Sequence, residues 1–590
     1  MKTKEESASG IEHARHTLAH LLAAAVLELH PDTKLTIGPA VENGFYYDFE
    51  FVEPISDKDL PKIEKVMRKL LPSWKEFSHR EVSPAEAREI FAANPYKLEL
   101  IEEIVAKGEK ITLYTCGKFT DLCRGGHVEN PAKEIADDSF KLERVAGAYW
   151  RGSEKNKMLT RVYGLAFETA TELEKFVAMQ EEAAKRDHRK LGKELDLFVF
   201  SDTVGKGLPL WTEKGATIRR VLERFIVDEE IRRDYKHVYT PDIAKIDLYK
   251  KSGHYPYYKD SMYAPIVIDD EEFMLRPMTC PHHYELYLSK PRSYKELPMR
   301  IAELSKLYRY EQSGELSGLI RVRSFCLADA HIITKDSTQA ADEVNQALDL
   351  IEYAIGVFGL KAGEHYSYRL SLGNRADDKK YFKNDAAWDE AEDKLRQVLK
   401  KRNAPFVEAE NEAAFYGPKI DIQMRDVRGK ENTAFTVQYD FVMPERFDML
   451  FTDSDGKEKR PIVIHRSSIG AIERIIAFLI EHYAGAFPLW LSPIQVKVLP
   501  ITDKHIDFAA SVTDELKKHN IRASLERDND SLGKKIRNAK LEKIPYMLII
   551  GDKEIETNSV TLESRDAGNL GAFTVPELTA KLLKEINEKK

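Results

Sequence analysis

The sequence is poor in cysteine. Its 590 residues include only four, at positions 116, 123, 280 and 326, which are too few and too scattered for the disulfide framework of a secreted protein. The N-terminal segment MKTKEESASG has no apolar signal-peptide core, and no run approaches the ~20 apolar residues of a transmembrane helix. We therefore expect a cytoplasmic protein that does not enter a membrane and whose thiols are free to bind metal.

Positive charge is not in excess either. The 90 lysines and arginines are outnumbered by 98 acidic residues, for a net charge of −8. This excludes a protein that coats nucleic acid with a uniformly basic surface, but it allows a local basic patch. The composition, 43% hydrophobic and 32% charged, is that of a globular protein. Because one hydrophobic core does not extend over so long a chain, we expect about three to four domains.

Two short motifs near the N-terminus combine histidine with cysteine. His16 and His20 are four residues apart in the apolar-periodic segment 11–29, so they share one face of a predicted helix. Cys123 and His127 flank a pair of glycines that allows a tight turn. The four side chains indicate either a metal site or a site in which acid–base groups position water.

The stretch LYRYEQSGELSGLIRVRSFCLADAHII, residues 307–333, concentrates charge around a turn-rich loop. It predicts a hairpin, with Arg309 and Glu311 in the first strand, that directs arginines, a carboxylate, a ring and an imidazole into one cleft. Guanidinium groups suit phosphate oxygens, and a ring between them suits a flat base. In isolation, an ordinary charged hairpin with a solvated face is the simpler interpretation. Motifs elsewhere in the chain argue against that interpretation.

The remaining pattern divides the chain. The charged segment 181–194, EEAAKRDHRKLGKE, predicts a helical connector. From residue 492 strands alternate with helices, which predicts a small α/β domain with a largely parallel sheet. Between these segments, apolar periodicity predicts helices over residues 210–235, 337–357, 385–401 and 469–483.

Five motifs occur in an order that resembles the threonyl-tRNA synthetases, a family of class II aminoacyl-tRNA synthetases. They are RPMTCPHH, the YRYE–RVRSF hairpin, DAH, FYGPK and HRSSIGAIER. HTLAH and CRGGH resemble the editing domain of that family, and the last hundred residues resemble its anticodon-binding domain. The resemblance covers nearly the whole chain, but it does not include the small ubiquitin-like domain with which many members begin.

The resemblance implies a multidomain α+β and α/β fold. An α+β editing domain is expected at residues 1–180, and a helical linker at 181–195. A class II catalytic core built on an antiparallel sheet is expected at 196–490, and an α/β anticodon-binding domain at 491–590. The implied activity is the activation of L-threonine by ATP, its transfer to tRNA(Thr), and hydrolytic editing of mischarged seryl-tRNA(Thr). A homodimer is also implied, because the helix and strand that end at Pro241 resemble the class II dimer motif.

The resemblance also assigns residues. Arg309, Arg321 and Arg474 are the expected catalytic arginines, which hold the phosphates of magnesium-bound ATP. The other expected ATP-binding residues are Glu311, Phe325, Lys419 and Gln438. The threonine pocket is expected to include Asp329, Tyr416 and Gln438. One Zn²⁺ per subunit is expected on Cys280, His331 and His465, whereas His282 and His283 are not counted as ligands. The expected editing residues are His16, His20, Lys97, Asp121, Cys123 and His127, and those for the anticodon are Asn529 and Glu554.

The sequence departs from the family pattern at a few of these places. His282 replaces a common glycine, Leu327–Ala328 replaces Gln-Asp, and Glu563 falls where a basic residue is usual. Two further departures are Asn432–Phe435 and Ala471. Two alternatives of other classes stay open at this point. One is a non-catalytic, synthetase-like RNA-binding regulator, and the other is a free-standing metallohydrolase that deacylates tRNA.

Overall fold

The computed structural model describes residues 4–590, with side chains from residue 10 onward. The chain forms two compact units, residues 1–181 and 182–590, which are considered separately. Within the described residues, no helix is both long and apolar enough to cross a membrane.

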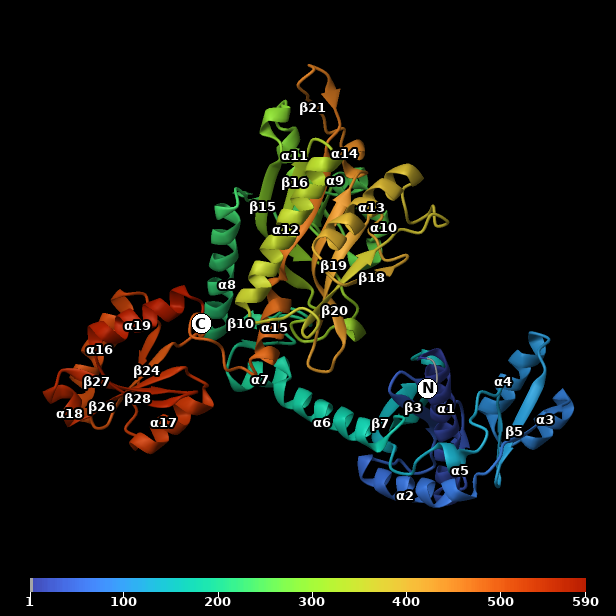
Figure 1. The fold of residues 1–590 in the computed structure, drawn as a ribbon. Coiled ribbons are helices and arrows are strands. Elements are labelled where there is room, and N and C mark those ends of the chain that lie inside the picture. The colour runs from blue at the N-terminus through green and yellow to red at the C-terminus, as the bar shows by residue number, and fades with distance from the viewer. Residues whose placement is uncertain (1–3) are drawn as a thin grey trace. The chain divides into compact units, whose positions relative to one another are not determined.

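The first unit is built on the long helix α1, Lys4–Leu29 (Figure 1). Its Ala- and Leu-rich face is fully buried, including Leu18, Leu21 and Leu22. It packs on a five-stranded sheet in the order β1-β3-β8-β7, with β2 beside β3. The strands are β1 (Lys34–Leu35), β2 (Ala40–Val41), β3 (Gly44–Glu50), β7 (Phe140–Tyr149) and β8 (Met158–Ala166). Helices α2 (Leu60–Leu70) and α5 (Pro131–Glu134) complete this layer.

A smaller three-stranded sheet completes the first unit. Its order is β4-β5-β6, and its small core is shared with α3 and α4. These elements are β4 (Ser78–Val82), α3 (Pro84–Ile90), α4 (Pro95–Ala106), β5 (Ile111–Cys116) and β6 (Phe119–Leu122). Because Cys123 and His127 follow β6, the small sheet delivers them toward α1. Helix α6, Ala170–Arg186, leads out of this unit, and α7, His188–Glu194, begins after one intervening residue.

The second unit contains an eight-stranded sheet in the order β11-β15-β16-β23-β20-β19-β17-β18. All its pairs are antiparallel except the two at the edges. The central strands are β15 (Met299–Tyr308), β16 (Ser324–Thr334), β19 (Lys419–Arg425), β20 (Glu431–Asp440) and β23 (Ile462–Ala471). The outer ones are β11 (Lys236–His237), β17 (Tyr366–Ser371) and β18 (Phe406–Ala409).

Helices cover one face of this sheet and form the main core (Figure 1). They are α8 (Glu213–Arg232), α12 (Ser337–Val357), α13 (Asp385–Lys401) and α15 (Ile472–His482). Smaller elements border the other face. They include α9 (Ile246–Ser252), α10 (His254–Tyr257), α11 (Cys280–Leu288), α14 (Met443–Arg446) and the strands β12 (Ile243–Lys245), β13 (Ile266–Ile268), β14 (Glu271–Leu275), β21 (Phe451–Thr452) and β22 (Glu458–Lys459). The short strands β9 (Phe198–Val199) and β10 (Leu210–Trp211) instead pack against α7 and α8 and belong with them to the main core. The antiparallel core expected from the family resemblance is therefore present.

Two local predictions were wrong. The strands of the predicted hairpin stop short of the charged residues, since β15 ends at Tyr308 and β16 begins at Ser324. Arg309, Glu311 and Arg321 consequently lie in the connecting loop, which frees them from the alternation of a strand. The C-terminal sheet, in the order β25-β24-β26-β27-β28, is also not largely parallel, because two of its four pairs are antiparallel.

The unpredicted strand of that sheet is β28, Gly568–Thr574. The remaining elements of the C-terminal region are β24 (Val496–Pro500), α16 (Ile506–Lys518), β25 (Ala523–Leu525), α17 (Leu532–Leu541), β26 (Tyr546–Ile550), α18 (Asp552–Glu556), β27 (Ser559–Ser564) and α19 (Val575–Asn587). Its strands and helices enclose a separate hydrophobic core.

Candidate functional sites

Four adjacent strands of the large sheet present polar side chains in two rows. Opposite residues of antiparallel strands share a face, and so do residues two apart on one strand. The first row consists of His331, His465, Gln438 and Lys419, on β16, β23, β20 and β19. The second row consists of Asp329, Ser467, Thr436 and Asp421. All of these except Asp421 line a cavity of about 600 Å³ above the sheet.

A thiol joins the first row. Cys280 begins α11, and one potential ligand atom each from Cys280, His331 and His465 lie within 4.8 Å of one another. All three side chains are buried. Burial lowers the pKa of His331 well below its usual value, so this imidazole is neutral, as a metal ligand must be. Burial also raises the pKa of Cys280, which a bound cation would oppose.

Each of the two histidines in this group has one ring nitrogen in a hydrogen bond. His465 Nε2 lies 2.7 Å from Asp440 Oδ2, and His331 Nδ1 lies 2.8 Å from His283 Nδ1. His283 in turn lies 3.3 Å from Glu303 Oε2 through its Nε2. Among residues 10–590, the second nitrogen of either ligand histidine has no hydrogen bond. This is the arrangement that metal-bound histidines show, in which an outer partner orients the ring.

The three expected arginines approach the cavity from one side. Arg309 and Arg321 line it, and Arg474 of α15 lies close enough to both to feel their charge. Burial, and then the charge of Arg309, lowers the pKa of Arg474 to about 10. Arg474 is fixed by donating to the backbone oxygens of Ile320 at 3.0 Å and Thr433 at 2.6 Å. Clustered like charges of this kind suit a polyanionic ligand.

The other expected ATP and substrate residues divide between lining the cavity and supporting it. Glu311, Lys419 and Gln438 line it, whereas Phe325 is buried beneath Arg309, whose guanidinium lies 5.2 Å from the ring centre. Tyr416 stacks on His465, with ring centres 4.9 Å apart. Its hydroxyl donates to Gln438 Oε1 at 2.5 Å.

Several lining residues were missed by the sequence analysis. They are His254, Tyr258, Ser261, Glu412, Thr436 and Ser467. Thr436 and Ser467 follow from the strand register, two residues from Gln438 and His465, and this periodicity could have identified them. No local pattern pointed to the others, which enter from α10 and from loops.

The departures from the family pattern fall in different places. Leu327 lines the cavity, whereas Ala328 is buried in the core. His282 is 8% exposed, and neither of its ring nitrogens has a partner among the described residues. Burial lowers its pKa to about 4. His282 is not one of the residues that line the cavity.

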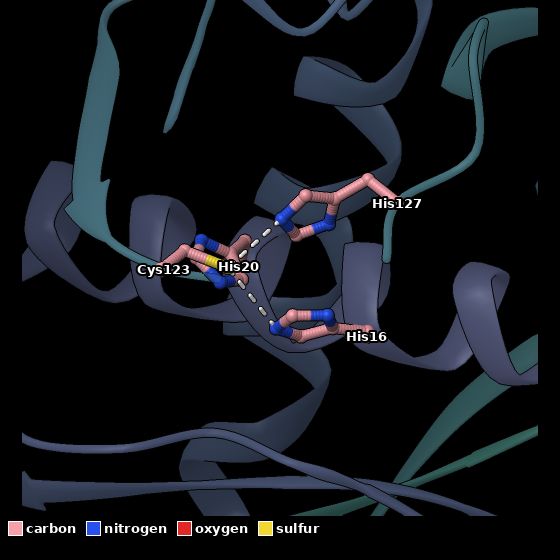
Figure 2. Close-up of side chains that lie close together, drawn as sticks. All are labelled: His16, His20, Cys123 and His127. Carbon is pink, nitrogen blue, oxygen red and sulfur yellow. Dashed lines mark hydrogen bonds between the residues drawn. The ribbon is translucent and has the colours of Figure 1, made fainter. Parts of the chain in front are cut away.

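The N-terminal unit assembles the other predicted group. His16 and His20 on α1 face Cys123 and His127 from the loop after β6 (Figure 2), and one potential ligand atom of each lies within 4.8 Å of the others. Cys123 Sγ lies 3.3 Å from His127 Nε2 and 3.6 Å from His16 Nε2. His16 Nδ1 donates to the backbone oxygen of Gly126 at 3.2 Å, so its Nε2 is the acceptor. Hydrogen bonds therefore close the cluster around Cys123, whereas His20 Nδ1 has no hydrogen-bond partner among the described residues.

Burial keeps this cluster uncharged. It lowers the pKa of His127 to about 2 and that of His20 well below its usual value, and it raises the pKa of Cys123 to about 11. At neutral pH the thiol is protonated and the imidazoles are neutral. Such groups can orient a water molecule, but they do not provide a thiolate nucleophile.

The two predicted supporting residues form a buried ion pair beside the cluster. Lys97 Nζ lies 2.5 Å from Asp121 Oδ1, and both side chains are 2% exposed. Tyr47, which the sequence analysis did not identify, donates to Asp121 Oδ2 at 2.6 Å. A cavity of about 350 Å³ is lined by Lys97, Asp121 and three of the four cluster residues, all except His127.

A third group of metal-binding residue types does not suit a metal. Asp187, His188 and Glu481 lie together, but His188 Nδ1 is 2.7 Å from Glu481 Oε1 and its Nε2 accepts from the backbone N–H of Leu319 at 3.1 Å. The ring therefore has no lone pair to offer.

The two residues expected to read the anticodon differ in exposure. Asn529 is exposed in the loop before α17. Glu554, in α18, is 9% exposed and accepts from Thr561 Oγ1 at 2.8 Å and from the backbone of Gly551 at 2.9 Å. Glu563 pairs with Lys540 at 2.9 Å, which offsets its unusual charge.

Comparison with protein families gives three matches. Residues 263–483 match the tRNA synthetase class II core domain (G, H, P, S and T), and residues 495–585 match an anticodon binding domain. Residues 111–163 match the threonyl and alanyl tRNA synthetase second additional domain.

Known proteins are similar over the whole chain. A threonine–tRNA ligase from Geobacillus sp. (strain WCH70) is 46% identical over 585 residues, which cover 99% of this chain and 90% of the relative. One from Staphylococcus carnosus is 47% identical and covers 99% and 89%. A solved structure, the RNA binding domain of threonyl-tRNA synthetase from Cryptosporidium parvum, is 36% identical with a TM-score of 0.64, over 68% of this chain and 98% of that one.

Proposed function

This chain belongs to the threonine–tRNA ligase family, and we propose that its two buried clusters carry out the two halves of that family's task. The chain is an enzyme that activates L-threonine with ATP, transfers it to tRNA, and hydrolyses mischarged seryl-tRNA. Activation takes place in the cavity above the large sheet, and editing takes place at the cluster on α1. The observation that carries this assignment is a single cavity lined by Arg309, Arg321 and the Cys/His₂ group, with Arg474 beside the two arginines.

Activation needs positioning more than acid–base chemistry. The threonine carboxylate, which is already ionised, attacks the α-phosphorus of ATP, a new P–O bond forms, and pyrophosphate leaves. Arg309 holds the α-phosphate, Arg321 contacts the triphosphate, and Arg474 holds the γ-phosphate. Their fixed charges stabilise the negative charge of the transition state. Magnesium enters with ATP and bridges phosphate oxygens.

The remaining cavity residues hold the base and the amino acid. Phe325 stacks on adenine, and Glu311 accepts from its amino group. Lys419 lies toward the nucleotide end of the cavity. Asp329 accepts from the amino group of threonine, and Tyr416 and Gln438 close the pocket around the side chain. The hydrogen bond between Tyr416 and Gln438 supports this arrangement, because it limits the positions of both groups.

Zinc fits the Cys280, His331 and His465 group. The donors are a thiol and two imidazoles, each imidazole with one free nitrogen, and a metal held by three protein ligands would have room to bind substrate. When bound, zinc supplies a Lewis acid for the amino group and hydroxyl of threonine. Asp440 and His283 keep the two imidazoles in the tautomers that direct a lone pair inward.

This pocket explains why a second site is needed. Valine has the shape of threonine but lacks the hydroxyl, so a site built to bind the hydroxyl rejects it strongly. Serine has the hydroxyl and lacks one methyl group, which is worth only about 1–3 kcal/mol. Hydrolytic editing makes up the difference.

For editing, the neutral cluster supplies hydrogen bonds to water. His16, His20, Cys123 and His127 orient the water molecule that attacks the ester, and Lys97 and Asp121 hold the seryl group in the adjoining cavity. The closed hydrogen bonding of Cys123 supports water positioning over tight metal binding.

The larger organisation is also proposed. Residues 1–180 form the editing domain, 181–195 the linker, 196–490 the catalytic domain and 491–590 the anticodon-binding domain, where Asn529 and Glu554 contact the tRNA(Thr) anticodon. Two such chains form a homodimer. Apolar side chains exposed on and after α8 support it, including Tyr239 at 94%, Ile231 at 55% and Ile243 at 45%. Sedimentation at micromolar concentration should give a dimer, and a monomer would contradict this proposal.

The enzyme works in the cytoplasm. All four cysteines are free thiols, which suits a reducing compartment. Fractionation of cells that express the tagged protein should recover it with cytoplasmic markers, and recovery in another compartment would contradict this proposal.

One experiment tests the main assignment. Metal analysis of the purified protein is combined with ATP–pyrophosphate exchange in the presence of threonine, serine or valine. We expect about one zinc per chain, exchange with threonine and serine, and little with valine. A non-catalytic RNA-binding protein or a free-standing deacylase would give no exchange with any amino acid.

A further inference from the structure

A buried histidine of the connector touches the loop that carries the phosphate-binding arginines. His188, the first residue of α7, is 2% exposed. Its Nδ1 lies 2.7 Å from Oε1 of Glu481 on α15, and its Nε2 lies 3.1 Å from the backbone nitrogen of Leu319. The residues that it joins are 131 and 293 positions away in the chain.

These contacts fix the protonation of the ring. A backbone N–H can only donate, so Nε2 of His188 must accept, and the single proton of the neutral ring lies on Nδ1. That proton is donated to the carboxylate of Glu481. Among the described residues, His188 is the only hydrogen-bond partner of the Glu481 carboxylate, through its ring and through its backbone N–H at 3.4 Å. Burying a carboxylate that has only one hydrogen-bond partner costs free energy of folding. We therefore expect this pair to have a functional role.

The loop is fitted closely to the imidazole. Gly318 has a φ of +50°, and a Cβ atom there would lie 2.1 Å from His188 Nε2. Leu319 is fully buried in the main hydrophobic core, together with Leu191 and Leu195 of the connector region. The imidazole of His188 therefore restricts the conformations that the loop backbone can adopt at Gly318 and Leu319.

The same helix holds the next peptide of the loop. Arg474 donates from Nε to the backbone oxygen of Ile320 at 3.0 Å. Arg474 and Glu481 are seven residues apart on α15, so they share a face two turns apart. The loop backbone is thus hydrogen-bonded at Leu319 by way of His188 and at Ile320 by Arg474 itself, immediately before Arg321.

We propose that His188 is a positioning residue for ATP: it fixes the loop at Leu319 so that Arg321 and Arg474 are already placed for the triphosphate. The inference rests on the proposed function, in which these two arginines bind ATP. Prior ordering reduces the entropy that ATP binding must otherwise supply. The connector then contributes to nucleotide affinity without touching the nucleotide, since none of its described residues lines the cavity.

Two substitutions separate the two hydrogen bonds of the ring. In His188→Asn the amide can still donate to Glu481, but nothing accepts from Leu319. In His188→Gln the longer side chain can bring an oxygen to the position of Nε2 and restore that acceptor. In threonine-dependent pyrophosphate exchange, His188→Asn should raise the KM for ATP about tenfold, the usual cost of one lost buried hydrogen bond. His188→Gln should recover most of this loss, and the KM for threonine should change by less than about twofold in both.

The control is His505→Gln, which alters a histidine of equal burial near the start of α16, away from this loop. Pyrophosphate exchange does not use tRNA, so this variant should behave as wild type. Equal rises of both KM values in His188→Asn, or an unchanged KM for ATP, would overturn the proposal.

A second measurement is independent of activity. Hydrogen exchange of a peptide that contains Leu319 should be at least about tenfold faster in His188→Asn than in wild type, His188→Gln or His505→Gln. Unchanged exchange at Leu319 would refute the inference even if the enzyme were inactive. Absence of threonine-dependent ATP–pyrophosphate exchange in the wild-type enzyme would instead refute the proposed function.

Discussion

The two units each hold a group of histidines with one cysteine, but among the described residues only the thiol of the first unit is hydrogen-bonded to its histidines. In the first unit Cys123 is bonded to His16 and His127, inside the cluster. Histidines of both units are also bonded outward, His16 to the backbone oxygen of Gly126, His465 to Asp440 and His331 to His283. Among the described residues, no hydrogen bond joins His331 or His465 to Cys280. Similar residue types therefore form a closed cluster in one unit and an open one in the other.

The difference indicates what each cluster is prepared for. Imidazoles that are anchored from outside and keep a lone pair directed inward occur in both clusters, so the state of the thiol makes the difference. A thiol that is already shared between two imidazoles needs those bonds broken before it can ligate. Counting ligand types predicts two metal sites, whereas the hydrogen bonds predict one metal site and one site for water. Four changes test this comparison.

The largest effect is expected from removing the thiols in turn. Cys280→Ser should lose zinc and reduce threonine-dependent pyrophosphate exchange on the order of 10³-fold, because the Lewis acid is worth several kcal/mol. Deacylation of seryl-tRNA should be unchanged in this variant. Cys123→Ser should show the reverse: full zinc content, normal exchange and impaired deacylation. Loss of zinc from Cys123→Ser, or of deacylation from Cys280→Ser, would show that the comparison is wrong.

The second largest effect is expected from removing the positive charge of Lys97 beside the closed cluster. Lys97→Met leaves Asp121 buried without its cation, which typically costs about 3–5 kcal/mol. The first unit should therefore become cleavable by protease at lower urea concentration in the full-length chain. Threonine-dependent pyrophosphate exchange should be unaffected, because the cavity for activation lies in the second unit.

The double variant Lys97→Met/Asp121→Asn is the matched control for this test. It removes both charges and should recover part of the lost stability, because an uncharged amide can still accept from Tyr47. If the single and double variants were equally destabilised, the loss would be due to packing and not to an unpaired charge.

The outer partner of the open cluster should have a smaller effect. Asp440→Asn keeps the size of the side chain but weakens the hydrogen bond that orients His465, which lies at 2.7 Å. Outer-partner changes of this kind usually reduce metal affinity about 10- to 100-fold. Competition with a chelator measures this directly. Zinc affinity equal to wild type would mean that the orientation of His465 depends on its stacking with Tyr416 instead.

The sequence predicted the elements well where local chemistry decides them. Residues 337–357 and 385–401 are helices with the expected ends, because apolar periodicity coincides with the N-caps Asp336 and Asn384. Strand β28 was missed because it contains Gly568, Asn569 and Gly571, which have low strand propensity. Its partner β27 pairs with it through the backbone, which composition does not reveal.

The sites show the same limit. Motif order and family resemblance selected Cys280, His331 and His465, which the structure brings together. No pattern pointed to Tyr47, Asp440 or the pairing of His188 with Glu481, since each acts across 25 to 293 residues of sequence. The hydrogen-bond partners of the cysteines and histidines, on which the comparison of the two clusters depends, are set by the fold and cannot be read from the sequence.

The smallest expected effect is a pH dependence confined to the closed cluster. Burial keeps the pKa of His127 at about 2 and that of His20 well below normal, whereas both titrate near 6.5 when unfolded. Below about pH 6.5 the unfolded state therefore binds protons that the native state does not, and stability falls as the pH falls, by up to about 1.4 kcal/mol per pH unit for each histidine.

Between pH 7 and 5.5, hydrogen exchange of α1 in the intact chain, corrected for its intrinsic rate, should accelerate accordingly. His127→Gln should reduce this slope, whereas His30→Gln, immediately after the C-terminal end of α1, should not. An equal slope in all three proteins would mean that the cluster is protonated in the native state and is not the neutral, water-positioning site that its closed hydrogen bonding implies.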